Sequence, residues 1–154
     1  MDYITLDKLV KDLNMEVIYK SDDMEDVKIT ASEINRPGLP LSGYFNKFAY
    51  KRLQIIGNVE WHYCNNLEKD IRYDRLEQIF SYAFPAMIIS RYLTVFPEIL
   101  KLAFEYNRTI LRTNLPTTKF INILINYLDY ALAPEITIHG VLAEVYGMGV
   151  LLIG

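Results

Sequence analysis

The end of the chain carries the residues that could bind a phosphate. The apolar run 150–153, VLLI, is typical of a buried strand, and Gly154 follows it directly. A phosphate-binding loop of the form G-x-x-x-x-G-K-S/T needs such a strand before its first glycine, because its backbone N–H groups must converge on phosphate oxygens. The pattern indicates Gly154 as a candidate cofactor-binding residue, and an ordinary strand that ends at a glycine is the alternative.

Two other groups of residues could do chemistry, and both have a structural explanation. His62 and Cys64 could bind a metal, but the sequence has no second cluster of histidine and cysteine to complete the site, so we interpret them as packing residues. The helix around residues 70–77 alternates acidic residues with arginines, which predicts a solvated face rather than a catalytic carboxylate pair. These residues are Asp70, Arg72, Asp74, Arg75 and Glu77.

The segment 35–45, NRPGLPLSGYF, holds two prolines and two glycines and predicts a loop with fixed turns. Its Arg36 and Tyr44 could contact an anion, another ligand or a second subunit. The alternative, which we favour, is that the prolines and glycines only satisfy the backbone geometry of the turns.

Composition limits the function classes. The chain has 154 residues, of which 51% are hydrophobic and 23% charged, which is typical of a globular domain with room for a short piece of a second. The net charge of −3 gives no electrostatic reason to expect nucleic acid or an anionic membrane as a partner. A single cysteine excludes an internal disulfide and fits a reducing compartment. With no signal-like or membrane-spanning segment, we expect a cytoplasmic protein.

The elements that must position these residues are strands and helices, which alternate along the chain. Such alternation of strands and helices favours an α/β fold with three layers, in which helices flank a mostly parallel sheet. Asn58 and the threonines Thr117 and Thr118 are predicted to cap helices, and Pro97 suits a first turn. We expect helices at 6–13, 58–67, 70–83, 96–107 and 116–132, and strands at 15–19, 27–34, 52–57, 85–90 and 109–113.

After Pro134 the pattern changes. Strands at 136–145 and 149–153, joined by the glycine-containing turn 146–149, predict an antiparallel hairpin. We therefore divide the chain into an α/β domain, 1–132, and a second part, 133–154. Because two strands alone are marginally stable, we expect the hairpin to belong to a larger sheet that this sequence lacks.

Several blocks of the sequence resemble one enzyme family. The stretch TTKFINILINYLDYALAPEITIHGVLAEVYGMGVLLIG is similar to the part of bifunctional HPr kinase/phosphorylase that leads into its P-loop. The blocks ITASEINRPGLPLSGYF and RLQIIGNVEW resemble the N-terminal domain of the same family, and ILRTNLPTTKFI also fits. The resemblance covers the chain from its first helix to Gly154, in the same order.

The resemblance implies a function for the parent protein. The family uses ATP, or pyrophosphate in some members, with Mg²⁺ to phosphorylate a serine of the phosphocarrier protein HPr. The same active site reverses the reaction with inorganic phosphate, and the activity controls carbon catabolite repression in bacteria. The resemblance also implies a hexamer and an N-terminal α/β domain like the uridine-nucleotide-binding domain of Mur ligases, which by itself does not establish nucleotide binding.

The same resemblance assigns two site residues. His139 corresponds to a histidine near the transferred phosphate, as an electrostatic or proton-handling group, and Gly154 corresponds to the first glycine of the P-loop. No metal ligand is assigned. The lysine and serine of the loop and the downstream aspartate are absent, so we expect this chain to be inactive alone and to bind no cofactor.

The role of the α/β domain has three interpretations. We favour a regulatory and scaffolding domain of the kinase. A small-molecule sensor that binds a nucleotide or metabolite, and an assembly domain that only holds subunits together, are the alternatives. An unrelated P-loop protein with similar lead-in strands is a further possibility. The family assignment fails if the residues encoded after Gly154 lack a G-K-S/T ending.

Overall fold

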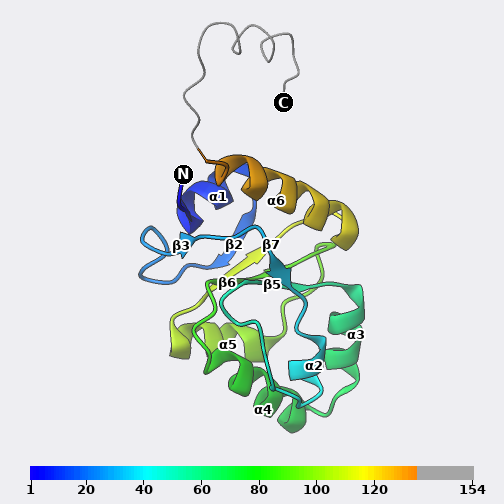
Figure 1. Cartoon of the computed structure of the whole chain (residues 1–154). Coiled ribbons are helices and arrows are strands. Elements are labelled where there is room, and N and C mark those ends of the chain that lie inside the picture. Colours follow the sequence, from blue (N-terminus) through cyan, green and yellow to red (C-terminus); the bar gives the residue numbers. More distant parts are fainter. Residues whose placement is uncertain (135–154) are drawn as a thin grey trace, which may run out of the picture.

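The centre of the molecule is a five-stranded sheet with the strand order β2-β7-β6-β5-β4 (Figure 1). The structure is a computed structural model, and it describes residues 1–134. Neighbouring strands from β4 to β7 are parallel, whereas β2 pairs antiparallel with β7 at one edge. The predicted mostly parallel sheet is therefore confirmed. The strands are β2 (Glu16–Tyr19), β4 (Ile34–Asn35), β5 (Leu53–Ile56), β6 (Ala86–Ile89) and β7 (Thr109–Arg112).

The central strands are apolar because both faces of the sheet are covered. All four residues of β5 and all four of β6 are buried, as is usual for parallel strands under helices on both sides. The continuous apolar run of β6, and the run of β5 interrupted only by Gln54, made these two strands recognisable in the sequence.

Helices cover both faces of the sheet, as the three-layer prediction required (Figure 1). Helices α1 and α6 pack on one face in a core that includes Leu9, Ile88 and Leu124, while the other four pack on the opposite face around Phe80 and Met87. The helices are α1 (Leu6–Asp12), α2 (Gly38–Leu41), α3 (Asn58–Asn66), α4 (Lys69–Phe80), α5 (Pro97–Tyr106) and α6 (Thr117–Ala131).

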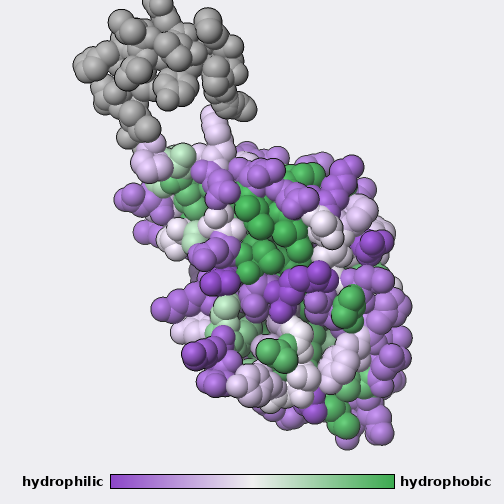
Figure 2. All heavy atoms as spheres, turned by 45° about the vertical axis from the view of Figure 1, so that its right-hand side comes forward, coloured by the Kyte–Doolittle hydropathy of each residue, from purple (hydrophilic) through white to green (hydrophobic). Residues whose placement is uncertain are grey.

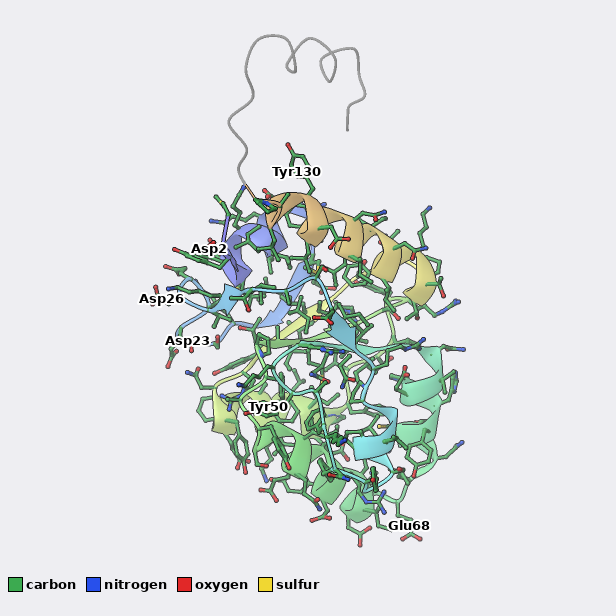
Figure 3. The ribbon with its side chains drawn as sticks, in the orientation of Figure 1. Asp2, Asp23, Asp26, Tyr50, Glu68 and Tyr130 are labelled. Atoms are coloured by element: carbon green, nitrogen blue, oxygen red, sulfur yellow. The ribbon has the colours of Figure 1, made fainter. Side chains whose placement is uncertain are left out.

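Helix α6 illustrates why the helices were predictable. Phe120, Leu124 and Leu128 recur every four residues and are buried against the sheet. Tyr130 belongs to the opposite face of the helix, is 80% exposed and points away from the molecule in Figure 3.

The predicted strand 27–34 is wrong as a single element. Its first part is β3 (Lys28–Ile29), which pairs antiparallel with β1 (Ile4–Thr5) in a separate two-stranded sheet. Its last part is β4, at the edge of the main sheet. Residues 30–33, TASE, are largely exposed and connect the two. The first part pairs with β1, the short strand before α1. Local sequence does not encode such a long-range pairing.

Two local predictions also need correction. The segment 35–45 is not loop throughout, because it contains the short helix α2. Asn58 is the first residue of α3 and not its cap, since Gly57 holds the cap position and the Glu60 carboxylate accepts its N–H. Pro97 at the start of α5 is as predicted.

The predicted hairpin lies outside the described residues, and the division into domains 1–132 and 133–154 stays a prediction. Helix α6 ends at Ala131, close to the predicted boundary. Figure 2 shows a mainly polar surface with apolar side chains gathered near the middle of that face. Among the described helices, none has both the length and the apolar character needed to cross a membrane.

Candidate functional site

The two site residues predicted from the sequence, His139 and Gly154, lie outside the described residues, so their roles stay predictions. In open α/β sheets, ligands usually bind outside the carboxyl ends of the parallel strands. The segment with Arg36 follows β4 at that edge, and the turn with Gly57 follows β5 beside it.

The Arg36 side chain is used within the chain. Its Nη2 lies 2.9 Å from Oε1 of Glu60, a residue that is only 7% exposed. The same carboxylate oxygen accepts the backbone N–H of Gly57 at 2.7 Å, which stabilises the start of α3. The arginine therefore neutralises a buried carboxylate, which agrees with the structural interpretation of the 35–45 segment.

Side chains also fill the space beside Gly57. A Cβ atom at this position would lie 2.4 Å from Nη2 of Arg36 and 2.7 Å from Cγ2 of Thr117. The Thr117 hydroxyl lies 2.6 Å from the Ser90 hydroxyl, and both residues are buried. The prediction that Thr117 caps its helix is wrong, because α6 has no side-chain cap and this hydroxyl binds Ser90 across the edge instead.

The carboxyl edge does not fit a nucleotide phosphate. The N-terminus of α3 would attract an anion, but the Glu60 carboxylate already occupies it. Within residues 1–134, no group of three or more histidine, cysteine, aspartate or glutamate side chains could hold a metal ion. At the carboxyl edge, the Glu60 carboxylate therefore takes the place that a nucleotide phosphate would need at the start of α3.

The prediction that one face of α4 is solvated is wrong at Arg72. This residue is 7% exposed, and its Nη2 lies 3.1 Å from Oε2 of Glu98 on α5. Its Nη1 donates to the Cys64 carbonyl at 3.2 Å, and its guanidinium lies 4.7 Å from the centre of the Phe96 ring. Arg72 thus joins three helices through one buried cation, while Asp70 and Asp74 are exposed as predicted.

His62 and Cys64 do not form a site together. Cys64 is 2% exposed in the core beneath α3, whereas His62 is exposed and contacts the edge of the Trp61 ring. Burial raises the pKa of the Cys64 thiol to about 12, which leaves it protonated and unreactive in the folded protein. The packing interpretation therefore agrees with the structure for Cys64.

The junction of α1 and α6 ties the two ends of the described chain together. The amino group of Met1 donates to the Ala133 carbonyl at 3.0 Å, and the Tyr127 hydroxyl donates to the Asp12 carboxylate. Lys8 contacts the same carboxylate at 2.9 Å. These contacts fix the position at which the chain leaves α6.

Replacing Tyr127 with phenylalanine should lower the melting temperature by a few degrees at neutral pH. The hydrogen bond from Tyr127, followed by that from Lys8, lowers the pKa of Asp12. Such a shift stabilises the folded state above the ordinary aspartate pKa of about 3.9, and the stabilisation is lost as the pH falls through the folded pKa. Thermal unfolding at neutral and strongly acidic pH measures the effect.

The matched control for this variant is Tyr130→Phe, which removes a hydroxyl from an 80% exposed ring on the same helix. It should leave the melting temperature unchanged at both pH values. An equal loss for Tyr127→Phe at neutral and acidic pH would contradict the assigned role of the Asp12 carboxylate.

An open cleft lies at the opposite edge of the sheet, where the parallel strands begin. Its volume is about 340 Å³, and its polar lining comes from Ser21, Asp23, Lys28, Thr30, Lys51, Asn107 and Arg108. Lys51 precedes β5 and Arg108 precedes β7, so the sheet brings distant segments together here. We call this the amino-edge cleft; the sequence prediction did not identify it.

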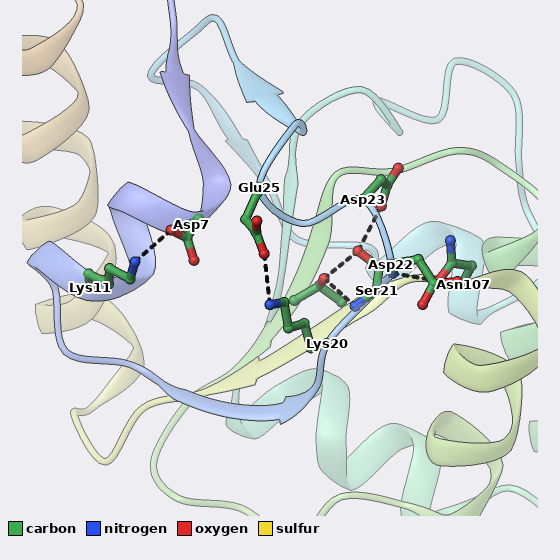
Figure 4. A network of polar contacts seen from close by, with 9 residues as sticks. Asp7, Lys11, Lys20, Ser21, Asp22, Asp23, Glu25 and Asn107 are labelled. Carbon is green, nitrogen blue, oxygen red and sulfur yellow. Dashed lines mark hydrogen bonds and ion pairs between the residues drawn. The ribbon is translucent and has the colours of Figure 1, made fainter.

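One wall of the amino-edge cleft is held by the polar network in Figure 4. The backbone N–H of Ser21 donates to the Thr109 hydroxyl at 3.0 Å, and that of Asp22 donates to Oδ1 of Asn107 at 2.8 Å. Asn107 ends α5 in a left-handed conformation with φ of 56°. The acidic segment 21–26 is therefore fastened to the start of β7, although Asp23 and Asp26 themselves lie at the outer surface in Figure 3.

Comparison with known proteins identifies relatives of the whole sequence. The sequence model of the family described as "HPr Serine kinase N terminus" matches residues 4–128. HPr kinase/phosphorylases of Thermoanaerobacter sp. (strain X514) and Alkaliphilus metalliredigens are each 49% identical over all 154 residues. That of Caldanaerobacter subterraneus is 46% identical over the same length. In each case the match covers 50% of the relative, so the chain spans about half the length of these proteins.

A solved structure supports the fold alone. It is the crystal structure of the CBS and DRTGG domains of the regulatory region of a Clostridium perfringens pyrophosphatase, complexed with its activator diadenosine tetraphosphate. The TM-score is 0.52 at 16% identity, and the match covers 87% of this chain and 52% of the other.

Proposed function

This chain belongs to the HPr serine kinase N-terminal family, and from that premise we propose that it forms the N-terminal regulatory and scaffolding part of a bacterial HPr kinase/phosphorylase. The observation that carries the proposal is the similarity of all 154 residues to about half the length of such enzymes. The complete protein would phosphorylate a serine of HPr, and dephosphorylate it, in carbon catabolite control.

The catalytic groups of this proposal belong to the end of the chain and to the polypeptide that follows it in the relatives. When bound there, ATP or pyrophosphate with Mg²⁺ would supply the phosphoryl group, with Gly154 as the first residue of the phosphate-binding loop. His139 would stabilise charge or handle a proton beside the transferred phosphate. The predicted hairpin would be the first part of that catalytic domain.

The scaffolding role has a physical basis at the junction of α1 and α6. The Met1 amino group and the Ala133 carbonyl hold the two ends of the described part together, and Tyr127 joins α6 to α1 through Asp12. A catalytic domain attached after Pro134 would start from a fixed point. Movement of α1 against α6 would be the route by which this domain could influence the kinase.

Assembly into a homo-oligomer, a hexamer by resemblance, belongs to the same proposal. Helix α5 and strand β2 expose apolar side chains beside one another. Phe104 is 74% exposed and contacts the ring of Tyr19, while Val17 and Leu100 are each more than 40% exposed. Such side chains suit a contact between subunits, which supports assembly alongside regulation. We also propose a cytoplasmic location.

The test compares three proteins in a phosphorylation assay with ATP, Mg²⁺ and HPr. Phosphoserine on HPr should appear with the protein extended beyond residue 154, and should be absent both with residues 1–154 alone and with HPr that lacks the target serine. An inert extended protein would contradict the proposed activity.

A third protein, which lacks residues 1–132, tests the regulatory and scaffolding role. We expect its specific activity or its mass in solution to differ from those of the extended protein. If kcat/KM and the oligomeric mass are both unchanged, this role is wrong even if the kinase assignment holds.

A further inference from the structure

The amino-edge cleft gathers positive charge on a protein whose net charge is negative. Lys28, Lys51 and Arg108 line it, and Asp23 is the single carboxylate among its lining residues. The whole chain has a net charge of −3. The acidic segment 21–26 lies at the same edge, so an anion would be bound by direct contact with the three lining cations and not by a long-range field.

These three cations have no carboxylate partner among residues 1–134. Other arginines near the sheet do, since Arg36 pairs with Glu60, Arg52 with Glu33 and Arg112 with Glu16. The Lys28 ammonium lies over the ring of Tyr3 at 4.6 Å, a contact that leaves its N–H donors available. Several cations elsewhere in the described part of the chain are also unpaired, among them Arg91 and Lys119. What distinguishes the cleft is that three unpaired cations line one cavity.

Arg108 is held in place without being neutralised. Its Nη1 donates to the Tyr106 carbonyl at 2.6 Å, and its guanidinium lies 5.8 Å from the centre of the Phe84 ring. Its Nε is buried and has no hydrogen-bond partner among the described residues. A buried donor without an acceptor is costly, and Arg108 is one of the residues that line the cleft.

The rest of the lining suits a small organic anion. Ser21, Thr30 and Asn107 provide hydroxyl and amide groups, while Phe84 and Pro85 form an apolar wall. The volume of about 340 Å³ lies at the lower end of the range of roughly 300–1,000 Å³ for small-molecule sites. We propose that the amino-edge cleft binds a small phosphorylated anion, whose phosphate contacts Lys51 and Arg108.

The proposed site is built from residues other than His139 and Gly154. It lies at the amino ends of the parallel strands, whereas Glu60 and Arg36 close the carboxyl edge. It also uses only described residues, so binding by this chain needs neither HPr nor a nucleotide-binding loop. A failed binding experiment would leave the kinase assignment untouched, and the reverse also holds.

Calorimetric titration of the 154-residue chain tests the proposal at about 0.15 M salt, where nonspecific attraction to surface charge is screened. The probes are inorganic phosphate, pyrophosphate and ribose 5-phosphate. We expect saturable binding of at least one probe with a Kd of about 1 mM or below. Tighter binding of ribose 5-phosphate than of inorganic phosphate would show that the hydroxyl, amide and apolar groups also contribute.

Substitutions locate the site. Lys51→Gln removes an exposed cation of the cleft and should raise the Kd roughly tenfold, while Asp23→Asn removes the opposing carboxylate and should lower it. Lys119→Gln makes the same charge change at an exposed position on α6 and should leave the Kd unchanged. Circular dichroism checks that each variant is folded.

Two results would overturn the proposal. One is the absence of saturable binding by all three probes. The other is a Kd that changes equally in Lys51→Gln and Lys119→Gln, which would mean that the anion responds to overall charge and not to the cleft.

Discussion

Replacing Glu98 with alanine should lower the free energy of unfolding by about 3 kcal/mol or more, because it leaves the buried Arg72 cation without a counterion. The two side chains are 9% and 13% exposed, and Nη2 of Arg72 lies 3.1 Å from Oε2 of Glu98. The remaining bond to the Cys64 carbonyl and the contact with the Phe96 ring cannot replace a carboxylate. Since domains of this size are stable by about 5–15 kcal/mol, the loss should be plain in urea denaturation.

Two further variants separate the ion pair from simple truncation. Glu105→Ala removes an exposed carboxylate on the same helix, 4.0 Å from Lys101, and should cost about 0.5 kcal/mol or less. The double replacement Arg72→Met with Glu98→Leu should recover most of the loss, because it removes both charges and fills the space with apolar atoms. If Glu98→Ala were as stable as Glu105→Ala, the pair would not be the buried contact described above.

The sequence predicted the layers of the fold well because burial itself sets the pattern. The run MII within β6 is covered on both faces, and Phe120, Leu124 and Leu128 lie on the one face of α6 that contacts the sheet. The spacing of apolar residues along the sequence therefore shows which faces of each strand or helix are buried. Pro97 and the left-handed Asn107, at the two ends of α5, mark the helix through backbone geometry alone.

The predictions that were wrong concern contacts between residues far apart in the sequence, which no local sequence pattern indicates. Arg72 lies in a charged stretch typical of a solvated face, and only its meeting with Glu98, 26 residues away, makes it a core residue. The segment 27–34 carries β-branched residues near both ends, such as Ile29 and Ile34, yet these ends pair in different sheets. Thr117 looked like a cap because it starts a helix, and its partner Ser90 comes from another strand end.

The same limit applies to the candidate sites. Lys51 and Arg108 are far apart in sequence, and they line one cleft because β5 and β7 begin at the same edge of the sheet. Lys28 comes from β3, in the separate two-stranded sheet. His139, in contrast, was assigned through the resemblance to a family, and Gly154 through the apolar run before it and the same resemblance. Their roles therefore depend on the parent enzyme, whereas the cleft depends on the fold of residues 1–134.

In the folded protein, Cys64 should react with alkylating reagents at least about three orders of magnitude more slowly than in the unfolded chain at pH 8. Burial raises its pKa to about 12, and the nearby Arg72 lowers it to a smaller extent. An ordinary cysteine has a pKa of about 8.5, so the unfolded chain contains far more of the reactive thiolate. Because Cys64 is the single cysteine of the chain, mass spectrometry of the labelled protein measures this rate without ambiguity.

The raised pKa also fixes how stability depends on pH at this residue. The contribution of the protonated, buried thiol is fully present below the unfolded pKa of about 8.5, and it is lost as the pH rises toward the folded pKa. Labelling then requires opening of the helices around Arg72, so the Glu98→Ala variant should be labelled faster in proportion to its loss of stability. A labelling rate unchanged by Glu98→Ala, or equal to that of the unfolded chain, would mean that Cys64 is not sealed beneath α3 by the Arg72 contacts.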